Sequence, residues 1–208
     1  MNGLTLLIDT SIRGLALGIF DRNKRKLVDK TISVDETASS HFISEALQEI
    51  CKKNSCEISD FTSSICAIGP GSFTGIRIGL SFLYGLTAQD QDFTFSSYSL
   101  LSEFAKSSAC TVGIASTKDK GFVADQFGTM RLVSAREIAD FNVSILIGSW
   151  DLALEVLGKE NIAFRQVSLV DVLTKVWNDF ETREIHYSFT KPVPEYLRLS
   201  SAEENKSL

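Results

Sequence analysis

Short apolar segments separated by polar turns fill the first hundred residues, and their spacing predicts strands followed by helices. Residues 4–8 form a continuous apolar run, and residues 15–19 alternate apolar with small side chains. A third strand is expected over residues 26–34, so the chain opens with an antiparallel meander. The other elements expected here are a helix over residues 39–53, a buried strand over 64–68, a helix over 76–89, a short strand over 93–95 and a helix over 99–106.

The pattern restarts at residue 111, which predicts a second lobe. The expected elements are strands over residues 111–115, 122–127, 143–147 and 162–167, a helix beginning at Ser134, and helices over residues 151–157 and 169–180. Ser134 and Glu137 have the spacing of a capping box, which marks a helix start. The predicted fold class is therefore α/β, with mixed β-sheets flanked by helices.

The two halves share this order of elements but no residue-level repeat. We expect an N-terminal lobe over residues 1–98 and a C-terminal lobe over residues 99–208. The tail after Thr182 is expected to be largely irregular and to pack back on the first lobe.

Charge and composition narrow the class of protein. The formal net charge is −5, which argues against a nucleic-acid-binding surface on this chain alone, because such surfaces need clustered Lys and Arg. No apolar run approaches the roughly 18 residues of a membrane span, and the N-terminal run is too short for a signal peptide. The four cysteines form no C-x-x-C pair, and Cys51 and Cys66 are expected to be buried. A reducing, cytoplasmic location is expected.

The segment from Gly69 to Gly75 resembles a phosphate-binding loop, since it joins a strand to a helix. It ends in Thr74-Gly75-Ile76 and so lacks the Gly-Lys-Ser/Thr of a Walker A loop. Its glycines, at positions 69, 71 and 75, also miss the G-x-G-x-x-G spacing of a dinucleotide site. Alone, the loop is a weak indication of nucleotide binding.

The helix after this loop carries Gly79 and Gly85, each costing up to about 1 kcal/mol relative to alanine. Glycines retained at that cost indicate that another backbone approaches closely. Two hypotheses stay open: tight packing inside the same domain, or a subunit interface anchored by Phe73, Phe82, Leu83 and Tyr84.

Residues 69–79, Gly-Pro-Gly-Ser-Phe-Thr-Gly-Ile-Arg-Ile-Gly, resemble the signature of the TsaB/YeaZ family. Leu7-Ile8-Asp9-Thr10-Ser11 is similar to that family's opening strand and turn, and Ser40-His41 to the start of its first long helix. Residues 194–198, Pro-Glu-Tyr-Leu-Arg, are similar to its closing P-x-Y-x-R. The resemblance covers residues 4–100 well and residues 110–190 thinly.

The resemblance implies a two-lobed fold of the actin and sugar-kinase type (ribonuclease H-like). It also implies an accessory subunit that binds and activates TsaD, the transferase that forms threonylcarbamoyladenosine next to the tRNA anticodon. The ATPase TsaE would join this complex, and tRNA would be contacted only through it. No intrinsic cofactor is expected, although ATP or ADP could bind at the interface of the complex.

Two sets of site residues follow from the resemblance and the glycine pattern. The expected partner interface consists of His41, Phe73, Gly75, Arg77, Gly79, Phe82, Leu83 and Gly85. The expected nucleotide or phosphate contacts are Asp9, Thr10, Ser11, Gly71 and Ser72. The interface hypothesis predicts that a bulky residue at Gly79 or Gly85 abolishes TsaD binding while the fold survives.

Catalysis by this chain alone is not expected. The only histidines, His41 and His186, are too far apart in sequence to form the helical metal-binding pair of TsaD-type relatives. Ser72 lies in no G-x-S-x-G elbow, so a serine protease is disfavoured. The alternative is an actin-fold ATPase or small-molecule kinase using Asp9 and the Gly69–Gly75 loop. A homodimer formed through the same helix when the chain is alone is a third hypothesis.

Overall fold

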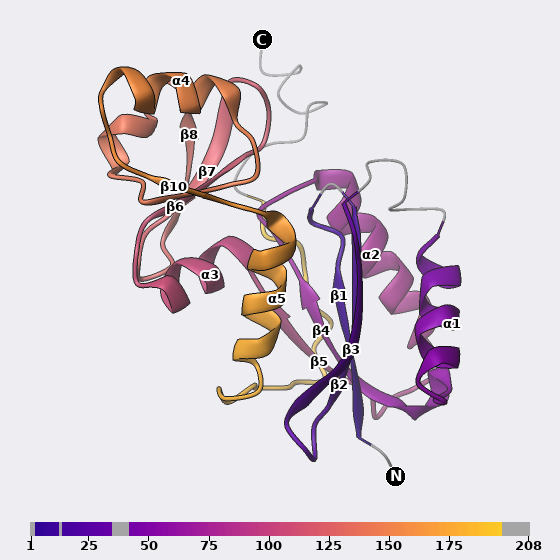
Figure 1. The fold of residues 1–208 in the computed structure, drawn as a ribbon. Coiled ribbons are helices and arrows are strands. Elements are labelled where there is room, and N and C mark those ends of the chain that lie inside the picture. The colour runs from indigo at the N-terminus through magenta and orange to yellow at the C-terminus, as the bar shows by residue number, and fades with distance from the viewer. Residues whose placement is uncertain (1–2, 13, 35–41, 197–208) are drawn as a thin grey trace. The chain divides into compact units, whose positions relative to one another are not determined.

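The computed structural model describes residues 3–12, 14–34 and 42–196, and the chain divides into two compact units. The first unit contains the chain up to Tyr98 together with Trp177–Glu195, and the second contains Ser99–Val176. Each unit is built around its own five-stranded sheet (Figure 1). The described part of the chain contains no helix long and apolar enough to cross a membrane.

The sheet of the first unit is mixed, with strand order β3-β2-β1-β4-β5. Its strands are β1 (Leu4–Asp9), β2 (Leu15–Asp21), β3 (Lys26–Ser33), β4 (Phe61–Ala67) and β5 (Thr94–Tyr98). The first three strands form the predicted antiparallel meander, whereas β4 runs parallel to β1 and β5 runs parallel to β4. The carboxyl ends of β1, β4 and β5 therefore lie at the same edge of the sheet, which is where α/β folds place functional loops.

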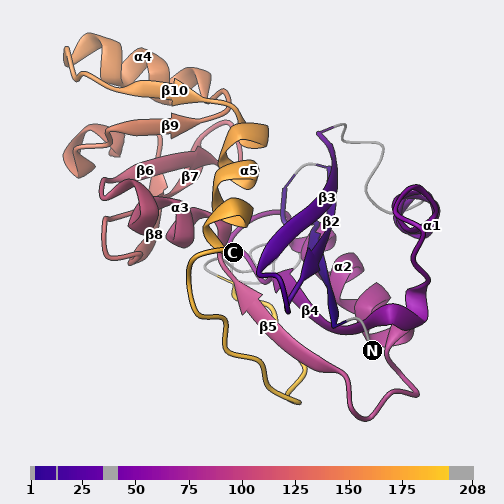
Figure 2. The same cartoon turned by 60° about the horizontal axis from the view of Figure 1, so that its bottom comes forward.

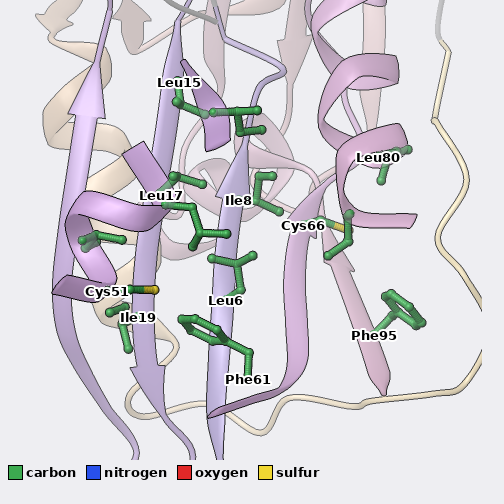
Figure 3. Packing of buried hydrophobic residues seen from close by; sticks show 14 of the residues in the cluster. Leu6, Ile8, Leu15, Leu17, Ile19, Cys51, Phe61, Cys66, Leu80 and Phe95 are labelled. Atoms are coloured by element: carbon green, nitrogen blue, oxygen red, sulfur yellow. The ribbon is translucent and has the colours of Figure 1, made fainter. Parts of the chain in front are cut away.

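Two helices, α1 (Ile43–Lys53) and α2 (Phe73–Leu86), cover one face of this sheet. A short 3₁₀ helix, η1 (Ile58–Asp60), precedes β4. Because side chains alternate along a strand, Leu6 and Ile8 of β1 point into the core beneath the helices (Figure 3). The core residues labelled in that view are Leu6, Ile8, Leu15, Leu17, Ile19, Cys51, Phe61, Cys66, Leu80 and Phe95.

The second unit repeats this strand arrangement in the order β10-β9-β6-β7-β8 (Figure 2). Its strands are β6 (Val112–Ala115), β7 (Lys120–Ala124), β8 (Met130–Ser134), β9 (Ile145–Ile147) and β10 (Arg165–Val167). Its helical elements are α3 (Leu100–Ser108), η2 (Ile138–Phe141), α4 (Asp151–Lys159) and the start of α5 (Leu169–Asp179). β6, β7 and β8 form an antiparallel meander, and β6, β9 and β10 are parallel.

Both sheets thus consist of three antiparallel strands followed by two that are parallel to the first. This confirms the predicted α/β fold class, with mixed sheets flanked by helices, and the architectural duplication. Near residue 134 the structure differs from the prediction. β8 was not predicted, and Ser134 ends that strand instead of starting an α-helix. Half of the predicted capping box forms, because the Ser134 amide donates to the Glu137 carboxylate. The Ser134 hydroxyl donates to the same carboxylate and does not accept from the Glu137 amide, and the 3₁₀ helix η2 follows.

Candidate functional site

Three segments that are far apart in sequence meet at the carboxyl edge of the first sheet. Residues 10 and 11 follow β1, and the loop of residues 69–72 follows β4. The Ser72 amide donates to the Ser11 carbonyl oxygen at 2.7 Å, and the Glu195 amide donates to the Ile68 carbonyl oxygen at 2.8 Å. The opening turn, the glycine loop and the start of the closing motif therefore form one loop cluster.

Helix α2 begins at Phe73, three residues before its predicted start, because the Ser72 side chain caps it. Ser72 Oγ accepts a hydrogen bond from the Gly75 amide at 3.1 Å, which satisfies one of the helix's free N–H groups. The cap and the Ser11 contact both fix Ser72, so the entry into α2 is set by the turn after β1.

Three glycines allow this close packing. A Cβ atom added at Gly75 would overlap the carbonyl oxygen of Thr10, and one added at Gly71 would overlap that of Ser11. A Cβ atom added at Gly79 would overlap the Thr10 hydroxyl. The close approach at Gly79 is thus made by a side chain of the turn after β1, and not by another backbone as the sequence indicated. Gly85 differs, since an added Cβ would have no atom within 4 Å.

Asp9 lies at the centre of the cluster and is fully buried. One carboxylate oxygen, Oδ1, accepts from the Ser11 amide at 2.9 Å and from the Ser11 hydroxyl at 2.7 Å. The other, Oδ2, accepts from the Tyr98 hydroxyl at 2.8 Å, and Trp177 Nε1 donates to the Tyr98 oxygen at 2.9 Å. This series of hydrogen bonds links the ends of β1 and β5 to the segment of residues 177–195, which returns to the first unit.

Burial governs the ionisation of Asp9. Loss of hydration raises its pKa above the ordinary value, although hydrogen bonds from Ser11, Tyr98 and the Ile12 amide act in the opposite direction. The pKa of Tyr98 is likewise raised, first by burial and then by the nearby Asp9 charge. A carboxyl group held this way stabilises the fold most when it is protonated.

A folded-state pKa above the unfolded-state value gives a defined pH dependence. The stabilisation by Asp9 is complete below the unfolded carboxyl pKa of about 3.9 and is lost as pH rises through the higher folded pKa. The Asp9→Asn variant has no such ionisation. We therefore expect wild type to lose stability relative to this variant as pH rises from 4 to 7, measured by urea unfolding at each pH. A constant difference across that range would contradict the raised pKa.

The five predicted phosphate contacts come together in the cluster, but their polar groups are directed at one another. Asp9, Thr10 and Ser11 are buried, Gly71 packs against the Ser11 carbonyl, and the Ser72 hydroxyl caps α2. In this arrangement the Asp9 carboxylate faces protein donors on both oxygens, unlike a carboxylate presented to magnesium or phosphate. Nucleotide binding here stays a prediction that requires the cluster to open.

The predicted interface residues fall into two groups. Gly75, Gly79 and Leu83 are buried inside the first unit, where Gly75 and Gly79 pack against Thr10. Their part in a partner surface stays a prediction. Arg77 and Gly85 are exposed, whereas Phe73 and Phe82 are half-buried, and the Arg77 guanidinium lies 4.0 Å from the centroid of the Phe73 ring. His41 lies outside the described residues.

Sequence reasoning missed Tyr98 and Trp177, which complete the hydrogen-bond chain to Asp9. Nothing in a single sequence distinguishes a core tyrosine from one that holds a buried carboxyl group. Within residues 3–12, 14–34 and 42–196, no group of three or more His, Cys, Asp or Glu side chains has an arrangement that could hold a metal ion.

The duplicated mixed sheets and the capped glycine loop define a two-unit α/β protein. No protein-family model matches the chain, and no curated protein matches its sequence. Solved structures do share its fold. A Pseudomonas aeruginosa protein with similarity to the peptidase YeaZ matches with a TM-score of 0.65 and 15% identity, covering 94% of this chain and 100% of that one.

YeaZ from Pseudomonas aeruginosa matches with a TM-score of 0.58 and 17% identity, covering 83% of this chain and 90% of that one. A Bacteroides thetaiotaomicron protein with an actin-like ATPase fold has a TM-score of 0.44 and 10% identity, over 84% of this chain and 96% of that one. The two YeaZ-type matches confirm the predicted resemblance at the level of the fold.

Proposed function

We propose that this chain is a non-catalytic accessory subunit that binds and activates a TsaD-type threonylcarbamoyltransferase. The observation that carries the proposal is the YeaZ fold, matched along 94% of the chain, together with the signature at residues 69–79. The loop cluster supports it, because the groups best suited to bind phosphate are occupied in holding the fold together.

The partner surface we propose is the exposed side of α2. Thr74, Ile78, Ser81 and Gly85 lie three or four residues apart and so share one side of the helix, which is defined here as the α2 stripe. All four are exposed or half-buried. The small side chains of Thr74, Ser81 and Gly85 let a partner helix approach closely, and Ile78 adds apolar surface. The Phe73 and Arg77 pair lies next to the stripe.

The remaining partners follow from this proposal. An acidic chain of net charge −5 would leave tRNA contacts to TsaD, with TsaE joining the assembled complex and any ATP or ADP held at its interface. The effect of this chain would then be on TsaD turnover more than on tRNA affinity. The same stripe could pair with a second copy when TsaD is absent.

Arginine substitutions on the stripe test this surface. We expect Ser81→Arg and Gly85→Arg each to weaken TsaD binding at least about tenfold, since a charged side chain in the centre of an interface must be desolvated without a partner. Calorimetric titration with TsaD measures the affinity, and the urea midpoint checks the fold. Ser107→Arg on α3 is the matched control, because Ser107 is also an exposed helical serine. Unchanged affinity in both stripe variants would place the interface elsewhere.

A further inference from the structure

Two of the four cysteines are brought together where α1 ends. The helix closes with a Schellman motif: the Ser55 amide donates to the Lys52 carbonyl oxygen at 3.3 Å, and the Cys56 amide donates to the Cys51 carbonyl oxygen at 3.1 Å. Ser55 has the left-handed φ of 53° that this motif requires. In such a motif the two residues joined by the hydrogen bond with the greater sequence span, here residues 51 and 56, frequently have side chains in contact. Both are cysteines.

The burial and electrostatics of the two thiols fit the proximity that the helix-ending motif gives them. The two thiols are close enough for Cys56 to contribute to the raised pKa of Cys51, and neither sulfur is in a disulfide. Cys51 is buried, beside Ile19 in the core of the first unit (Figure 3). Cys56 packs on the rim of the same core and is partly open to solvent. One cysteine is thus partly exposed to solvent, and the other is buried in the core.

We propose that Cys51 and Cys56 are a thiol pair that closes to a reversible intramolecular disulfide when the surrounding pool contains disulfide oxidant. Cys56 is the entry thiol, because it is the one that solvent reaches. Cys51 is the resolving thiol. Burial, followed by the proximity of Cys56, raises the pKa of Cys51 to about 12, which makes a direct reaction of Cys51 with solvent oxidants slow. This inference does not depend on the proposed function.

With glutathione disulfide as oxidant the steps balance. The Cys56 thiolate attacks one sulfur of glutathione disulfide, forming a mixed disulfide and releasing one glutathione thiolate. Cys51 then loses its proton and attacks the Cys56 sulfur, which forms the Cys51–Cys56 bond and releases the second glutathione. Two protein thiols are oxidised, one glutathione disulfide is reduced to two glutathione molecules, and an excess of reduced glutathione reverses both steps.

The experiment uses the full chain equilibrated in buffers of increasing ratio of oxidised to reduced glutathione. Free thiols are then blocked with N-ethylmaleimide, and intact and peptide masses are recorded. For wild type in the oxidising buffers we expect two fewer blocked thiols than in the fully reduced chain, and no glutathione adduct. We also expect a peptide in which Cys51 is joined to Cys56. For Cys51→Ser we expect the adduct to accumulate on Cys56 to at least about ten times its wild-type level, because no neighbouring thiol can expel it.

Two further variants test whether disulfide formation is specific to the Cys51–Cys56 pair or reflects the general reactivity of exposed thiols. Cys110→Ser removes another partly exposed cysteine and should leave disulfide formation unchanged. Cys56→Ser should leave Cys51 unmodified across the series. Circular dichroism of each variant checks the fold, and Cys51→Ala replaces Cys51→Ser if the buried serine unfolds the chain. A stable glutathione adduct on wild-type Cys56, a disulfide between two chains, or four free thiols throughout would overturn the proposal.

Discussion

Replacing Gly75 with alanine is expected to lower the free energy of unfolding by about 3 kcal/mol, the upper part of the range for overpacked interiors. The added methyl group would overlap the Thr10 carbonyl oxygen, which is backbone and part of the turn that leads from β1 to the loop cluster. Relief would require the start of α2 to move away from the sheet, and that movement would break the Ser72 contact with Ser11.

Gly85 supplies the matched control, since it is a glycine in the same helix with no atom within 4 Å of an added Cβ. Gly85→Ala should raise stability by about 0.5–1 kcal/mol, because alanine is favoured over glycine in an exposed helix. Urea unfolding followed by circular dichroism measures both variants. Equal effects at the two positions would contradict the packing of α2 against Thr10.

Truncating Trp177 to alanine is expected to cost about 3–5 kcal/mol, as for other large aromatic residues in cores. Its side chain is completely buried, and its Nε1 donates to the Tyr98 oxygen that in turn donates to Asp9. Trp177→Phe keeps most of the ring volume and loses the donor, so we expect it to cost about 1–2 kcal/mol.

The chain has two tryptophans, and Trp150 lies in the second unit. Fluorescence in a Trp150→Phe background therefore reports Trp177 alone, and circular dichroism at matched urea concentrations gives the stability of the truncated variants. If Trp177→Ala lowers the free energy of unfolding by less than about 1 kcal/mol, the hydrogen bonds from Trp177 to Tyr98 and from Tyr98 to Asp9 do not hold the first unit together.

Much of the fold followed from the sequence, because its periodicities are local. Apolar spacing predicted the meander, α1, the strand before the glycine loop and, apart from β8 and the helix expected at Ser134, the order of elements in the second half. β8 was missed because the turn before it is made by hydrogen bonds from the Phe127 and Thr129 amides to Asp125, with Gly128 at φ 84°. The start of α2 was missed because Gly75 disfavours helix by itself, and the Ser72 cap outweighs that preference.

The sequence predicted which segments form the candidate site, but it did not predict the contacts between them. Asp9, Ser11 and the glycine loop were singled out, and they do meet. What the sequence could not supply was the other partner in each contact. The close approach at Gly79 is made by Thr10, which is remote along the chain, so local pattern alone could not separate internal packing from an interface. The same holds for Tyr98, whose hydroxyl donates to Oδ2 of Asp9.

The most direct test of the proposed function is the mass of the species formed when the purified chain is mixed with TsaD from the same organism. Size-exclusion chromatography with light scattering, under reducing and low-salt conditions and with and without ATP, gives that mass. A stoichiometric heterodimer, with TsaD turnover that depends on this chain, is the predicted result. Two separate peaks under every condition, with TsaD turnover unaffected by the chain, would contradict the proposal that it is an accessory subunit.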